Sequence, residues 1–145
     1  MDNRHRYKDS LIIRSSVDYL KDVERFVESV FKQRGISDVK FNRLFLCVSE
    51  GVSNAIIHGN KNQLDKYVKI RIELNHIEAV ITIEDEGSGF NYGEVPEPVG
   101  NDNILKEQGR GLHIIKTYAK NVSFLNRGST LKIIFDISAD DTIFS

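Results

Sequence analysis

The chain has 145 residues, of which 40% are hydrophobic and 28% charged, and its formal net charge is −1 at pH 7. This length suits one domain with a single core, and this composition excludes a largely disordered chain. The near-zero charge excludes a global basic field for nucleic acid or anionic lipid, and no apolar run approaches the length of a membrane span.

The amino-terminal part of the chain predicts a short strand followed by a helix. Residues 10–14 form the strand, and Ser16 can cap the helix that follows. Apolar residues then recur at helical spacing as far as Phe31, and Gly35 ends the helix.

A second helix is predicted from a cap at Ser37 or Asp38 to about His58. One stripe of this helix is apolar and should face a sheet: Leu44, Val48, Val52 and Ala55. The single cysteine, Cys47, lies in the same stretch, where we expect a buried small hydrophobe. One cysteine excludes an internal disulfide, and the polar amino terminus shows no signal peptide, so we expect a cytoplasmic protein.

Alternation of apolar and polar residues predicts an antiparallel hairpin in the middle of the chain. Its strands are residues 68–74 and 79–84, joined by a turn at Asn75-His76. Residues 85 to about 108 then combine glycines, prolines and acids with little periodicity. We expect one long loop there that acts as a lid.

The last part of the chain predicts a helix over 109–120 and two strands, 121–126 and 131–137, with an acidic, frayed tail over 138–145. Helices and strands alternate, but the strands pair mostly as hairpins. The predicted fold class is therefore an α/β two-layer sandwich, with helices on one face of a mixed, mostly antiparallel sheet. We expect a single domain over residues 1–145, with its core at about 8–137.

Two polar residues, Glu50 and Asn54, lie four apart on another flank of the second helix. An asparagine offers Mg²⁺ a neutral oxygen ligand, and a glutamate can take a proton from a nucleophile or hold a metal-bound water. A solvated helix face is the alternative interpretation of this pair.

Asp85 shares a strand face with Ile81 and Ile83, so its carboxylate should enter the space between the layers. A buried carboxylate needs hydrogen-bond donors, and the exocyclic amine of adenine is one such donor. The alternative is an aspartate that caps the loop after it.

Two glycine-rich turns complete the candidate site. Gly87 and Gly89 allow a ligand to approach the backbone closely. The run Gly109-Arg110-Gly111-Leu112 should open a helix, and bare amides at a helix start predict a phosphate site. Arg110 could add positive charge there, or it could be an ordinary exposed arginine.

In their order along the chain, residues 50–59, 85–90 and 109–112 closely resemble the nucleotide-binding boxes of the GHKL ATPases. The turn at Gly128-Ser129 resembles the last box of that superfamily. The resemblance implies the Bergerat (histidine-kinase-like ATPase) fold and Mg²⁺-ATP. It also implies that Ser129 joins Asp85 in holding adenine, or Thr130 if the register shifts by one.

Within that superfamily the chain is most similar, as far as about residue 137, to the anti-sigma-factor serine/threonine kinases. The shared segments are Asn54–Gly59, Gly89-Phe90, Pro96–Pro98 and Gly109–Leu112. The resemblance implies phosphorylation of an anti-anti-sigma protein, capture of a sigma factor, and a homodimer. By this match Glu50 is the catalytic base and Asn54 the Mg²⁺ ligand. The implied nucleotide-binding residues are Asn54, Asp85, Gly87, Gly89, Gly109, Arg110, Gly111, Leu112 and Ser129.

Two other functions compete with a kinase. One is a non-catalytic module that binds ATP without transferring phosphate, against which the intact Glu50 argues. The other is a catalytic fragment of a histidine kinase. We expect this less, because the sequence begins almost directly with the first strand and shows no dimerisation helix with a phospho-accepting histidine.

Overall fold

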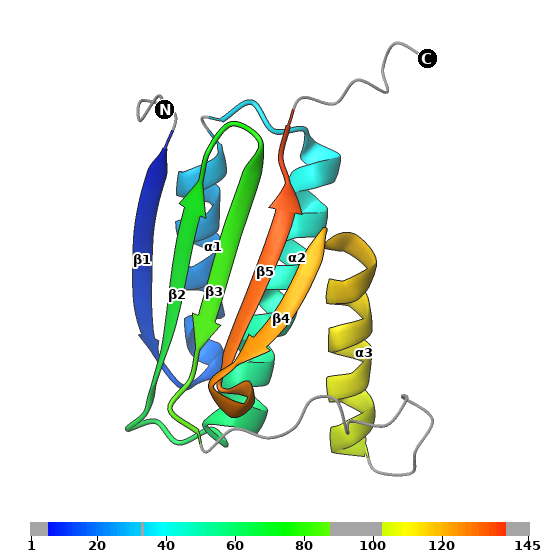
Figure 1. Cartoon of the computed structure of the whole chain (residues 1–145). Coiled ribbons are helices and arrows are strands. Elements are labelled where there is room, and N and C mark those ends of the chain that lie inside the picture. The colour runs from blue at the N-terminus through cyan, green and yellow to red at the C-terminus, as the bar shows by residue number, and fades with distance from the viewer. Residues whose placement is uncertain (1–5, 33, 88–102, 139–145) are drawn as a thin grey trace.

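The computed structural model describes residues 6–32, 34–87 and 103–138, without the side chains of 103–108 (Figure 1). The strands form one sheet of order β1-β2-β3-β5-β4, and the helices cover one face of it. The strands are β1 (Tyr7–Arg14), β2 (Tyr67–Leu74), β3 (Glu78–Glu84), β4 (Asn121–Leu125) and β5 (Thr130–Asp136). The helices are α1 (Leu20–Phe31), α2 (Asp38–Asn54) and α3 (Asn103–Tyr118), with short turns η2 (Val17–Tyr19), η3 (Ala55–Gly59) and η5 (Asn126–Gly128). The predicted two-layer α/β sandwich is confirmed.

Every pairing between the described strands is antiparallel, so the sheet is less mixed than expected. The reason lies in the connection through α3. This crossover makes β4 run in the same direction as β3, as a crossover between strands usually does. However, β5 returns between them and separates the two parallel strands.

Serine caps begin the helices at the predicted places. The Ser16 hydroxyl accepts a hydrogen bond from the Asp18 amide at 3.2 Å and so starts η2, which leads into α1. The Ser37 hydroxyl accepts from the Lys40 amide at 3.2 Å, so Ser37 rather than Asp38 caps α2. Gly35, between α1 and α2, has φ of +71°, a conformation that glycine adopts without steric cost.

Helix α2 forms the centre of the core. Its predicted apolar stripe is buried against the sheet: Leu44, Val48, Val52 and Ala55. At Gly51 the helix comes so close that a Cβ atom would lie 2.7 Å from Cδ1 of Ile83 and 3.0 Å from Cδ2 of Leu131. Burial of each large aliphatic side chain here contributes about 1.5–3 kcal/mol. This packing fixes the carboxyl end of α2 over the ends of β3 and β5.

Helix α3 begins at Asn103, six residues before the predicted start at Gly109. The intervening residues 104–108 are Ile-Leu-Lys-Glu-Gln, and their helix propensity outweighs the two glycines that follow. Gly109 and Gly111 therefore lie inside the helix, where backbone amides bond to carbonyls one turn back. The expectation of bare helix-start amides at Gly109–Gly111 is wrong for this structure.

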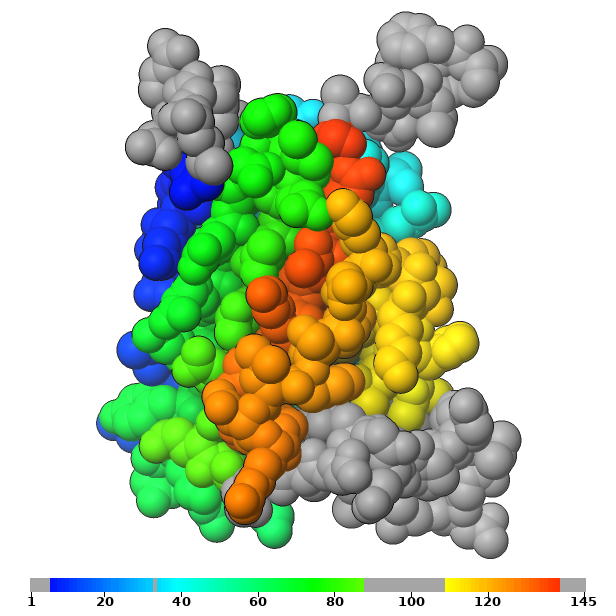
Figure 2. Space-filling model, viewed as in Figure 1, coloured from blue at the N-terminus to red at the C-terminus, as the bar shows by residue number. Residues whose placement is uncertain are grey.

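The opposite face of the sheet is not covered by helices and forms the surface in Figure 2. Along β2, for example, Val68 and Ile70 are buried toward the helices, whereas Lys69 and Arg71 lie on the open face. None of the helices in the described part of the chain combines the length and the apolar character needed to cross a bilayer.

Candidate functional site

A small cavity lies where the carboxyl end of α2 meets the ends of β3 and β5. It is lined by Gly51, Asn54, Ala55, Ile83, Asp85, Leu112, Gly128, Ser129 and Leu131. Four of these, from distant segments, were predicted site residues: Asn54, Asp85, Leu112 and Ser129. The cavity volume is about 10 Å³, enough for roughly one water molecule.

Asn54 is the polar residue on the helix side of this cavity. Its side chain is 7% exposed, and within the described residues its Nδ2 atom has no hydrogen-bond partner. A buried polar group without a partner costs about 1–3 kcal/mol. Nδ2 is a hydrogen-bond donor, so in the present orientation it suits an anionic oxygen or a water molecule. Rotation of the carboxamide by about 180° would instead present the acceptor Oδ1 to a cation. The site thus holds one polar group that a ligand can satisfy.

Glu50 lies one helical turn before Asn54, beside α3 rather than in the cavity lining. A Cβ atom at Gly111 would lie 2.9 Å from Oε2 of Glu50 and 3.3 Å from Nδ2 of Asn54. Burial raises the pKa of the Glu50 carboxyl, and the nearby Arg110 guanidinium partly opposes this rise. The absent side chain of Gly111 thus lets α3 approach both polar residues of α2.

Asp85 enters the cavity from the end of β3. Its amide donates to the Ser129 carbonyl at 2.9 Å, and its Oδ1 accepts from the Gly87 amide at 2.8 Å. Burial raises the pKa of the Asp85 carboxyl, while the Gly87 amide and the Lys66 charge lower it. The Asp85 side chain therefore both caps the turn that follows β3 and lines the cavity.

Two glycines bring the neighbouring backbones into contact. A Cβ atom at Gly59 would lie 2.3 Å from Oδ2 of Asp85, and one at Gly87 would lie 2.1 Å from the Gly59 carbonyl oxygen. No side chain fits at either position without movement of its neighbours. The turn after η3 and the turn after β3 are therefore packed backbone to backbone.

The register of β3 and β5 decides which hydroxyl lies in the cavity. Thr130 pairs with Glu84, and its Oγ1 accepts from Nδ2 of Asn126 at 3.0 Å. Ser129 lies one residue earlier, opposite Asp85, and lines the cavity, although its hydroxyl donates to the Asn126 carbonyl at 2.9 Å. The structure places Ser129, not Thr130, beside Asp85.

The remaining predicted residues are placed as follows. In α3, Gly109 is buried and Arg110 is exposed. Gly89 and the predicted lid motif at residues 96–98 lie outside the described residues. Across the ranges that are described, no group of three or more His, Cys, Asp or Glu side chains could hold a metal ion. Mg²⁺ usually keeps several waters and takes oxygen ligands from substrate phosphates, so it does not require such a group.

Asn60 is a buried polar residue that was not among the predicted site residues. Its side chain is 0% exposed, and it makes hydrogen bonds to Tyr67 and Glu86. An asparagine after a glycine at a helix end is an ordinary stop signal. No feature of the sequence indicates that its side chain bridges two strands.

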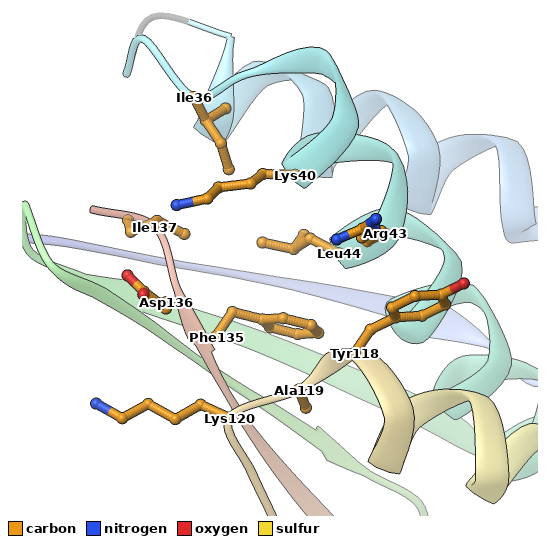
Figure 3. Close-up of a pocket in the computed structure, with 10 residues that line it drawn as sticks. All are labelled: Ile36, Lys40, Arg43, Leu44, Tyr118, Ala119, Lys120, Phe135, Asp136 and Ile137. Carbon is orange, nitrogen blue, oxygen red and sulfur yellow. The ribbon is translucent and has the colours of Figure 1, made fainter. Parts of the chain in front are cut away.

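A second hollow, of about 230 Å³, lies at the other end of the sheet (Figure 3). Its cations are already engaged: Lys40 donates to the Ser138 carbonyl, Arg43 lies over the Tyr118 ring, and Lys120 pairs with Glu78. None of the predicted site residues lines it. The small cavity at Asn54 and Asp85 is therefore the better candidate.

Comparison with known proteins gives the same fold and a consistent set of relatives. Residues 13–135 match the family model described as histidine kinase-like ATPase domain. An anti-sigma F factor of Clostridium botulinum is 38% identical over 85 residues, which cover 57% of this chain and 56% of that protein. The match therefore spans little more than half the length of this relative.

Two further relatives are matched over more of their length. An anti-sigma F factor of Oceanobacillus iheyensis is 32% identical over 68% of this chain and 70% of that protein. The serine-protein kinase RsbW of Staphylococcus epidermidis is 28% identical over 83% of this chain and 80% of its own. Among solved structures, the blue-light activated histidine kinase of Erythrobacter litoralis EL346 aligns with a TM-score of 0.54 and 20% identity, covering 83% of this chain and 42% of that one. That likeness supports the fold alone.

Proposed function

The chain belongs to the histidine kinase-like ATPase family, in a group with anti-sigma factors, and from this premise we propose that it is an ATP-dependent serine/threonine protein kinase of anti-sigma-factor type. Its proposed substrate is a serine or threonine of an anti-anti-sigma protein, and its proposed second partner is a sigma factor. The names of two relatives, anti-sigma F factor and serine-protein kinase, support both parts. The observation that carries the proposal is the convergence of Asn54, Asp85 and Ser129 on one cavity, where the Nδ2 atom of Asn54 has no described partner.

In this proposal the cavity is the innermost part of the nucleotide site, where the base binds. Oδ1 of Asp85 is occupied by the Gly87 amide, and the carboxylate can still accept from the amine of adenine. A cavity of about 10 Å³ is far below the several hundred Å³ of ordinary ligand pockets. Nucleotide binding therefore has to widen it. The contact of Gly111 with Glu50 and Asn54 is the place where α3 would separate from α2.

The Asn54 side chain is buried and its Nδ2 atom has no described partner, so no described bond from Nδ2 holds the amide against a turn that presents Oδ1 to Mg²⁺ beside the phosphates. When bound, the ion neutralises charge on the phosphate oxygens. Asn54 offers the ion one neutral oxygen ligand after the amide turns. The helix that carries Asn54 packs tightly against the sheet at Gly51, so the backbone position of this residue is fixed while its amide turns.

Phosphate transfer would proceed by attack of the substrate hydroxyl oxygen on the γ-phosphorus. The bond from that phosphorus to the bridging oxygen breaks, ADP leaves, and the hydroxyl proton passes to the Glu50 carboxylate. A raised pKa makes Glu50 a better proton acceptor, provided that it remains ionised at the working pH. Arg110 contributes to keeping it ionised.

One observation favours the alternative, a non-catalytic ATP-binding module. Glu50 does not line the cavity, and its carboxylate lies against Gly111 of α3. If α3 keeps this contact when ATP is bound, Gly111 covers one side of the Glu50 carboxylate and restricts the approach of a substrate hydroxyl. In that case the nucleotide would only set the conformation that a partner recognises.

Incubation with γ-labelled ATP and a cognate anti-anti-sigma domain tests these functions. The kinase predicts label on a serine or threonine of the partner, and loss of label with Glu50→Gln while ATP affinity is kept. ATP binding without label, and no effect of Glu50→Gln on partner binding, would instead support the module. Absence of ATP binding by the folded chain contradicts both. Arg43→Ala, in the hollow at the other end of the sheet, is the matched control and should transfer label to the partner domain as the unmodified chain does.

We also propose a homodimer and a cytoplasmic location. Strand β1 is an edge of the sheet, and its Ile12 side chain is 58% exposed, which supports an edge that pairs with a second copy. Analytical ultracentrifugation of the chain and of Ile12→Lys tests the dimer: a monomeric variant supports it, and an unmodified chain that is already monomeric at high concentration contradicts it.

A further inference from the structure

At the open end of the β2–β3 hairpin, away from its turn, side chains join the two segments where backbone hydrogen bonds would be expected. The register pairs Leu74 with Ala79 and Lys69 with Glu84, and its continuation would pair Tyr67 with Glu86. The Asn75 amide donates to the Glu78 carbonyl at 3.0 Å at the start of the same ladder. Hydrogen-bonded pairs recur at every second residue of an antiparallel ladder, so the Tyr67–Glu86 position should be a bonded pair.

Asn60 occupies the space that this backbone pair would fill. Its Nδ2 donates to the Tyr67 carbonyl at 2.9 Å, and its Oδ1 accepts from the Glu86 amide at 2.8 Å. The Tyr67 amide donates to Oε2 of Glu86. The carboxamide of Asn60 thus stands between the strands as an inserted peptide group would, and β3 separates from β2 after Glu84.

This separation determines where Asp85 lies. On one side the Asp85 amide stays bonded to the carbonyl of Ser129, the residue just before β5, and on the other the amide of Glu86 is held by Asn60. The residue before Asn60, Gly59, lies under the Asp85 carboxylate, and its carbonyl touches Gly87. The two-residue turn Gly59-Asn60 therefore contacts Asp85 and the two residues that follow it.

From this geometry we infer that Asn60 is a positioning residue that fixes the Asp85 carboxylate for recognition of the adenine base. The inference rests on the proposed nucleotide site and assigns the base selectivity of that site to a residue outside the cavity. Asn60 does not touch the base. It acts through the Glu86 amide, and its complete burial and paired hydrogen bonds leave it no freedom to move.

The test compares ATP and GTP binding by calorimetry in Asn60→Ala and in the milder Asn60→Ser. GTP carries a carbonyl oxygen where ATP carries the amine, so a well-placed Asp85 carboxylate favours ATP. Loss of one hydrogen bond to a charged group corresponds to about tenfold or more in affinity. We expect Asn60→Ala to weaken ATP binding by this factor and leave GTP binding nearly unchanged. An unchanged ratio of ATP to GTP affinity in both variants would overturn the inference.

A stability control separates positioning from general destabilisation. Val27→Ala shortens a fully buried side chain of α1, a helix that contributes no residue to the cavity lining, and should also lower the melting temperature. The ratio of ATP affinity to GTP affinity should be the same in this variant as in the unmodified chain. If Val27→Ala changes the ratio as Asn60→Ala does, the effect belongs to lost stability and the inference fails.

A second measurement needs no nucleotide, so it separates failure of this inference from failure of the proposed function. The Gly87 amide is bonded to Asp85, not to Asn60, and NMR can follow its hydrogen exchange together with the titration of the Asp85 carboxyl. In Asn60→Ala we expect faster Gly87 exchange and, because the Gly87 bond that lowers the Asp85 pKa is weakened, an Asp85 titration at higher pH. If both stay unchanged, Asn60 does not position Asp85, whether or not the chain binds ATP.

Discussion

The Asp85 carboxylate rests directly on the backbone of Gly59: a Cβ atom at Gly59 would lie 2.3 Å from Oδ2 and 2.4 Å from Cγ. Gly59 ends the π-helical turn η3 that continues α2, and Asp85 follows β3. The contact therefore joins the helix that carries Asn54 to the strand end that carries the candidate adenine acceptor. A substitution at Gly59 should act on Asp85 before it acts on anything else.

Gly59→Ala should displace the Asp85 carboxylate and lower both stability and ATP affinity. A methyl group forced into such a contact typically costs about 1–3 kcal/mol. In an Asp85→Ala background the clash is absent, so the same substitution should cost much less. Urea unfolding of the single and double variants measures this coupling. Strictly additive losses would show that the carboxylate does not occupy the position described.

Asp85→Asn should stabilise the nucleotide-free chain at neutral pH and weaken ATP binding. Burial raises the folded-state pKa of Asp85 above its unfolded value, so the folded chain binds this proton more tightly. The contribution of the group to stability is therefore full below the unfolded pKa of about 3.9 and is lost as pH rises through the folded pKa. Asparagine can keep the bond to the Gly87 amide and carries no charge to bury.

Urea unfolding across pH, with calorimetry at neutral pH, checks this second prediction. The free energy of unfolding of Asp85→Asn should exceed that of the unmodified chain at pH 7, and the difference should shrink toward pH 3. Its ATP affinity should fall, because an amide can turn a donor toward the adenine amine. A variant that is less stable at neutral pH, with unchanged ATP affinity, would contradict both the burial and the adenine role of Asp85.

The elements that the sequence predicts well are those whose signal is local. Alternation over residues 68–74 and the stripe from Leu44 to Ala55 each reflect one buried face, and both faces are buried as expected. The shared face of Ile83 and Asp85 placed the carboxylate between the layers for the same reason. Periodicity is sufficient where each residue has only to face the core or the solvent.

The features that could not be predicted depend on contacts between segments. The start of α3 balances the propensity of residues 104–108 against two glycines, and the glycine signal alone gave the wrong boundary. The role of Asn60 follows from two strands that separate at one ladder position. The small size of the cavity follows from how closely the residues of α2, β3, α3 and β5 that line it pack together. None of these quantities is a property of a single segment.

Cys47 should be unreactive while the chain is folded. Its side chain is 0% exposed, and burial, with the Glu50 charge nearby, raises the pKa of its thiol to about 12. A thiol reagent reacts with the thiolate, so at pH 8 labelling should occur only through unfolding. The labelling rate should rise with urea in step with the unfolded fraction. Rapid labelling of the native chain without urea would contradict this burial.

Arg110→Ala should move the titration of Glu50 to higher pH. Burial raises the pKa of Glu50, and the Arg110 guanidinium holds that rise in check. Without the arginine, Glu50 keeps its proton to a higher pH, so the acid limb of a phosphotransfer pH profile should shift upward while the rate at pH 8 to 9 changes little. Lys116→Ala, an exposed cation later on α3, is the matched control and should leave the limb in place. NMR titration of the Glu50 carboxyl in the nucleotide-free chain gives the same answer without any activity. If neither the NMR titration nor the acid limb moves in a folded Arg110→Ala chain, then Arg110 does not act on Glu50.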